Sequence, residues 1–257
     1  MIGVSSTRFC SESPEESLMR ISKEFGHWEI VSEGEHYLPL IMGRLKAIAP
    51  SYNVKFSIHA PISDVNIASL NERIREASTL EIIAAMEHAI ELNADTVTFH
   101  PGLQSVIVPG QEKRSMEKAK RSIRTIDRLM NEFGIIAALE NLPMMPSFGF
   151  MIGKTAKEMH ELIDGTEMRI CFDTGHANTV GQIDEIIDLL GDRIVNVHIH
   201  DNNGSNDDHM TIGDGNIDFK KTLSKLSKYK GRYIIESRSL ESAVTSRERL
   251  NELLRSI

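Results

Sequence analysis

The sequence predicts a single α/β domain over residues 1–257, with the fold of a (β/α)8 or TIM barrel. Eight short runs rich in β-branched residues alternate with eight helical patterns along the chain, and such an alternation over about 250 residues is typical of this barrel. A doubly wound open sheet is the alternative fold. It more often carries a glycine-rich phosphate loop after the first strand, and the segment GVSSTRF has none.

The predicted strands are short apolar runs, and the predicted helices have apolar residues spaced three and four apart. The strands are expected at residues 2–5, 27–32, 54–59, 96–100, 135–140, 168–173, 194–200 and 232–237. The helices are expected at residues 14–24, 38–49, 78–92, 112–133, 154–163, 182–190, 219–226 and 242–255.

Helix start signals agree with these ranges. Residues 13–16 (SPEE) offer an N-cap, a proline in the first turn and early carboxylates. Ser78 precedes the third helix, and residues 154–155 precede the fifth. The third helix is expected to turn one apolar face to the core, formed by Leu80, Ile83, Ala84, Ala89 and Ile90.

The composition is that of an ordinary soluble globular protein, with 40% apolar and 26% charged residues. No apolar run approaches the roughly 20 residues of a membrane span. The N-terminus lacks a basic segment followed by a long apolar core, so no signal peptide is expected. The only cysteines, Cys10 and Cys171, are expected to be free thiols, which favours a cytoplasmic location.

The formal net charge of -8 argues against a general affinity of the surface for nucleic acid. It leaves room for a basic cleft, because bound divalent metals add positive charge that a count of side chains omits.

Histidines and carboxylates gather where the predicted strands end. Ionisable side chains are rarely buried unless they are paired or bind a metal, and the carboxyl ends of barrel strands face one catalytic site. Imidazoles and carboxylates in this number predict bound divalent metals. The ionisable residues at or near these strand ends are His59, His100, Glu140, Asp173, His176, His198, Asp207, His209 and Glu236, with His200 beside them.

The longest predicted loops, at residues 59–78, 100–112 and 201–218, all follow strands and therefore lie on the same face of the barrel. Loops of that length on that face are usually functional.

The phrases HAP, HPG, LEN, FDTGHA, VHIHD, DxH and IGDGNIDF occur in this order along the chain. Together they resemble the superfamily that joins endonuclease IV to the xylose isomerase-like sugar isomerases and epimerases. The resemblance runs from the first strand to Glu236 and implies a TIM barrel with its active site in the loops that follow the strands.

The resemblance to endonuclease IV implies three metals. One would be bound by His59, His100 and Glu140. The second would share Glu140 and add Asp173, His198 and Glu236, and the third would be bound by His176, Asp207 and His209. The isomerase and epimerase relatives typically rely on one metal, held by the four central residues Glu140, Asp173, His198 and Glu236.

Three departures from the nucleases argue against duplex DNA as the substrate. No aromatic side chain follows His59 in HAPI, where DNA-cleaving members usually carry one. The loop at residues 34–37 (GEHY) is short and acidic, where a DNA-binding protein would need Arg or Lys. The seventh-strand motif is HIHD rather than HxND, and no wedge residue that would bend the duplex is identifiable.

Several residues keep alternative interpretations. Asp207 and His209 are metal ligands by type and spacing, or part of a solvated loop. His200, which shares the strand parity of His198, orients a ligand, contacts substrate or makes a plain hydrogen bond. Glu29 resembles a glutamate of sugar isomerases, or pairs with a cation at the barrel mouth. Residues 213–216 (GDGN) present N–H groups to a phosphate or sugar, or form a simple turn.

Two functions are consistent with these residues. The first is a metal-dependent phosphoester hydrolase, in which Glu140 bridges metals and Glu236 orients the nucleophile; His176, Asp207 and His209 favour it because an isomerase has no evident need for them. The second is a sugar or sugar-phosphate isomerase or epimerase with Glu140 and Glu236 as the acid and base. A non-enzymatic barrel has no feature in its favour.

The expected cofactor is Zn2+, up to three ions, because zinc suits an imidazole-rich ligand set, with Mn2+, Co2+ or Fe2+ as alternatives. The expected partner is a small phosphorylated or sugar substrate, or abasic DNA if the chain is a nuclease. No membrane association is expected.

Overall fold

The computed structural model describes residues 1–104, 109–144 and 150–257, and within these residues eight parallel strands close into one barrel. The strands are β1 (Ile2–Ser5), β2 (His27–Val31), β3 (Lys55–His59), β4 (Thr96–Phe99), β5 (Ile136–Glu140), β6 (Arg169–Asp173), β7 (Ile194–Ile199) and β8 (Arg232–Glu236). Each strand pairs with its neighbours in chain order, and β8 closes on β1 with Ser5 opposite Glu236. The predicted TIM barrel is confirmed.

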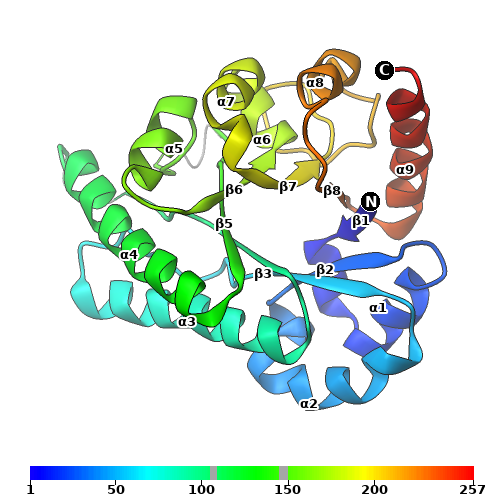
Figure 1. Cartoon of the computed structure of the whole chain (residues 1–257), viewed down its shortest axis with the longest axis horizontal. Helices are drawn as coiled ribbons and strands as arrows, with labels where there is room; N and C mark the ends of the chain where they lie inside the picture. The colour runs from blue at the N-terminus through cyan, green and yellow to red at the C-terminus, as the bar shows by residue number, and fades with distance from the viewer. Residues whose placement is uncertain (105–108, 145–149) are drawn as a thin grey trace.

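The helices form a ring around the strands and follow one another in chain order (Figure 1). They are α1 (Pro14–Ile21), α2 (Leu38–Ile48), α3 (Glu72–Glu91), α4 (Glu112–Phe133), α5 (Ala156–Ile163), α6 (Thr174–Thr179), α7 (Ile183–Leu190), α8 (Phe219–Lys225) and α9 (Leu240–Arg255). Short 3-10 turns lie at η1 (Thr7–Ser11), η2 (Gly34–His36), η3 (Ala49–Ser51) and η5 (Gly191–Arg193). None of the helices in the described part of the chain is long and apolar enough to cross a membrane.

The hydrophobic core lies between the strands and the helices. Side chains alternate along a strand, so Phe56 and Ile58 of β3 are buried against the helix layer while Ser57 and His59 point into the barrel. TIM-barrel interiors are usually filled by bulky branched side chains. Here the interior is largely polar and fully buried, with His27, Glu29, Ser57, Thr96, Thr98, Asn196 and His198 among its residues.

Helix α3 differs from its prediction at the N-terminus and in its buried face. It begins at Glu72 because the Asn71 side chain accepts hydrogen bonds from the N–H groups of the first turn. Ser78 is therefore inside the helix, and the loop after His59 is shorter than predicted.

The predicted apolar face of α3 was only partly correct, since Ala89 is buried but two of the larger predicted residues are not. Leu80 and Ile90 are 64% and 48% exposed, and the face that packs on the core carries Ile82, Met86 and Ala89. The helix has apolar residues on two faces, so the packing of the whole barrel, rather than the local pattern, selects the buried one.

Helix α6 was not predicted. It follows β6 directly and uses Asp173 as its N-cap, with the carboxylate accepting a hydrogen bond from the N–H of His176. Cys10 and Cys171 are free and buried. Part of the predicted loop at residues 100–112 lies outside the described residues.

Candidate metal centre

The structure brings the nine predicted metal ligands together at the carboxyl ends of the strands, in groups whose ligand atoms lie within 4.8 Å of one another. The first group is His59, His100 and Glu140, and the central group is Glu140, Asp173, His198 and Glu236. The remaining predicted ligands, His176, Asp207 and His209, fall into two overlapping groups that both contain His200.

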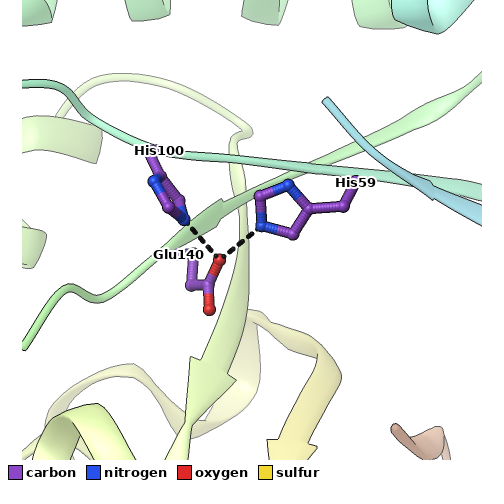
Figure 2. Close-up of side chains that lie close together, drawn as sticks. All are labelled: His59, His100 and Glu140. Atoms are coloured by element: carbon purple, nitrogen blue, oxygen red, sulfur yellow. Dashed lines mark hydrogen bonds and ion pairs between the residues drawn. The ribbon is translucent and has the colours of Figure 1, made fainter. Parts of the chain in front are cut away.

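The first group converges on one oxygen of Glu140, as Figure 2 shows. Nε2 of His59 and Nε2 of His100 lie 3.0 and 3.1 Å from Oε2 of this carboxylate. His59 ends β3, Glu140 ends β5, and His100 follows β4 directly. The barrel therefore places the three side chains beside one another because their strands end at the same face.

The central group uses the other oxygen of Glu140. Nδ1 of His198 lies 3.0 Å from Oε1 of Glu140 and 3.3 Å from Oε1 of Glu236. Asp173 approaches the same nitrogen at 3.9 Å. Its Oδ2 is fully buried and accepts no hydrogen bond from any described residue. A buried carboxylate oxygen without a donor is a ligand atom that a metal would satisfy.

Glu29 lies inside the barrel rather than at its mouth, and it contacts His198 of the central group. Its Oε1 lies 2.6 Å from Nε2 of His198, and its Oε2 accepts hydrogen bonds from Ser57 (2.8 Å) and Asn196 (2.9 Å). Burial alone would raise the pKa of Glu29, but the facing His198 outweighs it and lowers the pKa to about 2. The resulting carboxylate accepts the Nε2–H of His198, which leaves Nδ1 of that ring for Glu140 and a metal.

Around Asp207, His176 and His209 point at the same carboxylate oxygen. Nε2 of His176 lies 3.3 Å and Nε2 of His209 lies 3.0 Å from Oδ2 of Asp207. His209 has a φ of 46°, a left-handed conformation that is uncommon outside glycine. Only 15% of the Asp207 side chain is exposed, so its carboxylate is mostly shielded from solvent.

The carboxylates and imidazoles of the centre shift one another's pKa values. Burial penalises the charged forms, yet facing imidazoles hold the pKa of Glu140 and of Asp207 well below the usual range. The carboxylates in turn raise the pKa of His176 well above the usual value, and Cys171 together with the carboxylates does the same for His198, in both cases against the effect of burial. Divalent metals fit this donor set, because they supply the positive charge that the carboxylates attract and displace protons from the imidazoles.

Some residues of the centre were not predicted from the sequence. Ser57 and Asn196, which hold Glu29, sit two positions before His59 and His198, and strand parity could have indicated them. Asn141 hydrogen-bonds the backbone N–H and carbonyl of Asp173 through its amide group. No periodic pattern could have indicated this contact.

The GDGN segment forms a turn around a carboxylate of the chain itself. The N–H groups of Gly213 and Gly215 both donate to Oδ2 of Asp201 at 2.9 Å. A side chain at position 215 would bring a Cβ to 2.3 Å from Oδ1 of the same aspartate. These N–H groups are therefore engaged, which favours the simple turn over a phosphate-binding loop.

A family model for xylose isomerase-like TIM barrels matches residues 24–256 of the chain. The chain is 38% identical to the uncharacterized protein MJ1311 of Methanocaldococcus jannaschii, over 98% of this chain and 88% of that protein. It is 30% identical to the probable endonuclease 4 of Thermoplasma volcanium, over 60% of this chain and 56% of that protein.

Among solved structures, a D-tagatose 3-epimerase-like protein superposes with a TM-score of 0.91 and 36% identity, covering 99% of this chain and 97% of that one. The chain is thus similar both to proteins named as nucleases and to proteins named for sugar chemistry.

Proposed function

The chain belongs to the xylose isomerase-like TIM-barrel family, and on this premise we propose that it is a divalent-metal-dependent phosphoester hydrolase. The single observation that carries the proposal is the position of Glu140 between two histidine groups. Its Oε2 faces His59 and His100, and its Oε1 faces His198. A carboxylate whose two oxygens face different imidazoles is suited to bridge two ions. An enzyme with one metal in the central group would not need His59 and His100 as ligands.

Two neighbouring divalent ions would stabilise the charge on the attacking and leaving oxygens of a phosphoester. The chain would hold one with His59, His100 and Glu140, and the other with Glu140, Asp173, His198 and Glu236.

Glu236 is the carboxylate of the central group that solvent reaches. Its side chain is 12% exposed, against 1% for Glu140 and 0% for Asp173. In this position Glu236 can accept a hydrogen bond from the attacking water and orient it.

A small phosphorylated substrate fits this chain better than duplex DNA. Residues 60–71, which join His59 to α3, contain no aromatic and no basic side chain. A duplex would need phosphate-binding cations and a wedge at the mouth, and the formal charge of -8 adds repulsion.

The test is phosphate or alcohol release by protein loaded with Zn2+ or Mn2+, with bis(p-nitrophenyl) phosphate, sugar phosphates and an abasic-site duplex as substrates. The variant H100N should lower hydrolysis at least about 100-fold, the scale of losing a charge-stabilising group. The exposed His160 provides the matched control, and H160N should retain full activity. Hydrolysis that survives in H100N, or an inactive metal-loaded protein across the whole panel, contradicts the proposal.

A sugar epimerase is the second candidate, and the similarity to the D-tagatose 3-epimerase-like structure favours it. In this reaction Glu140 and Glu236 would remove and return a proton on opposite sides of a ketose. Only the central group would be needed.

The two candidates differ in their response to the same substitution. An epimerase would incorporate deuterium from D2O into a ketose such as D-tagatose, and H100N would leave this exchange unchanged while E236Q abolished it. Absence of exchange across a panel of ketoses, with metal bound, would exclude this candidate.

A further inference from the structure

The imidazole ring of His200 is buried against Gly175, at a position where no larger residue would fit. The residue follows β7 directly and is 0% exposed. A Cβ added at Gly175, in α6, would lie 2.0 Å from Cε1 and 2.4 Å from Nε2 of this imidazole. Gly175 does not have a positive φ, so the neighbouring ring, rather than the backbone conformation, accounts for the glycine.

The inner nitrogen of His200 faces two carboxylates without hydrogen-bonding either of them. Nε2 lies 3.2 Å from Oδ1 of Asp173 and 3.4 Å from Oδ1 of Asp207. Within the described part of the chain, neither this Nε2 nor Oδ1 of Asp207 has a hydrogen-bond partner. Buried polar atoms this close normally bond to each other, so their geometry indicates a shared target that lies between them.

Three imidazoles approach the Asp207 carboxylate, and His200, Asp207 and His209 together form a group with metal-ligand spacing. The Nε2 atoms of His176, His200 and His209 lie 3.3, 3.4 and 3.0 Å from its oxygens. Two ligands on one tetrahedral zinc ion, each 2.0–2.1 Å from it, are about 3.3 Å apart. The rings of His200 and His209 also stack, with centroids 4.2 Å apart and 19° between their planes.

We propose that His200 is a fourth protein ligand of the third metal, alongside His176, Asp207 and His209. A zinc site with four protein ligands is closed and structural, whereas a catalytic site keeps a position open. This ion would fasten the loop at residues 201–218 to β7 and α6 and would not contact the substrate. The inference rests on the metal centre of the proposed function but is independent of which reaction the centre catalyses.

The test uses the variant H200N, which keeps a polar side chain of smaller size. Zn2+ binding is titrated against a competing chelator, and the visible spectrum of the Co2+-loaded protein is recorded beside it. We expect the third equivalent of Zn2+ to bind at least about 10-fold more weakly. Removing a residue that only hydrogen-bonds a metal ligand already weakens binding by about this factor. The strong visible absorption of four-coordinate Co2+ should decrease by the amount that the third site contributes.

The matched control is H36N, which replaces another buried histidine outside the centre. It should leave both the metal affinity and the spectrum unchanged. Two results would overturn the inference: an unchanged third equivalent in H200N, or weaker binding with an unchanged Co2+ spectrum, which would mean that His200 only supports the site from behind.

A measurement on the unaltered chain covers the case in which H200N does not fold. In protein loaded with 113Cd, the ring protons of His200 should show scalar coupling to a cadmium resonance that also couples to His209. Coupling to His209 without coupling to His200 would overturn the inference. If the chain proves not to hydrolyse phosphoesters but this coupling is present, the proposed function is wrong and the inferred third site still stands.

Discussion

His59 and His176 each have one ring nitrogen held by a backbone carbonyl, which leaves the other nitrogen for the metal centre. Nδ1 of His59 donates to the carbonyl of Ala60, and Nδ1 of His176 donates to the carbonyl of Asn141, both at 2.8 Å. A carbonyl only accepts, so these Nδ1 atoms carry a proton, and a bound metal would displace any proton from the Nε2 atoms and use their lone pairs. This arrangement is common behind metal-binding histidines, because it fixes the tautomer before a metal arrives.

The ring nitrogen of His198 that faces away from Glu140 contacts the carboxylate of Glu29. Removing this carboxylate should weaken metal binding at the central group. In the variant E29Q the buried amide cannot supply the negative charge that holds Nε2–H of His198. We expect metal affinity of the central site to fall about 10- to 100-fold, measured by chelator competition. The exposed Glu87 offers the control E87Q, which should bind as the unaltered chain does. Equal affinities for E29Q and E87Q would refute the supporting role of Glu29.

Acid should destabilise the fold through a histidine that lies outside the centre. His36 is 1% exposed and packs against Trp28. Burial lowers its pKa from 6.5 to about 4, despite the nearby Ser13 backbone and Glu12 carboxylate. Because the folded pKa is the lower one, the stabilisation is complete above pH 6.5 and is lost as the pH falls towards 4. The loss is about 3 kcal/mol.

Urea unfolding between pH 7 and pH 4 measures this loss. The variant H36Q should show a shallower fall in the free energy of unfolding over that interval, whereas H160Q, at an exposed position, should match the unaltered chain. Identical pH slopes for H36Q and the unaltered chain would show that His36 does not titrate in this way.

At the scale of the elements, the side chain of Asn71 caps the N-terminus of α3. Asn71 accepts hydrogen bonds from the N–H groups of Arg73 and Ile74, at 3.1 and 3.5 Å. Removing an N-cap of this kind costs about 1 kcal/mol. The variant N71A should therefore lower the free energy of unfolding by about that amount, measured by urea unfolding. An exposed substitution in the next helical turn, E76A, serves as the control. A helix that began at Ser78 would make N71A neutral.

The strands could be predicted closely because their signal is local. Each is a short β-branched run, and each predicted boundary lies within one residue of the observed one. The polar residues that end the strands mark the site in the same sequence. The buried face of α3 could not be predicted in full, since Leu80 and Ile82 are equally apolar and only the packing of the whole barrel distinguishes them.

The contacts that orient the ligands could not be predicted from the sequence either. Glu29 and His198 are 169 positions apart, and only closure of the barrel shows that they meet. His200 is a similar case. Its strand parity indicated an inward ring, but its approach to Asp207 depends on the path of the loop after β7.

At the scale of the whole molecule, the barrel brings together candidate metal ligands that are far apart in the sequence. The residues of the first and central groups come from β3, β5, β6, β7, β8 and the residue after β4. Metal binding should therefore stabilise the closed barrel as a unit, because ions that bind only the folded chain shift the folding equilibrium.

The metal content of the chain decides whether the centre is multinuclear. Protein purified without a chelator or a metal-binding tag is supplied with excess Zn2+, freed of loose metal, and analysed for bound ions per chain. We predict about three equivalents, as expected for a centre with several ions. A single equivalent that persists in excess metal would contradict a multinuclear centre and leave only the central group as a functional site.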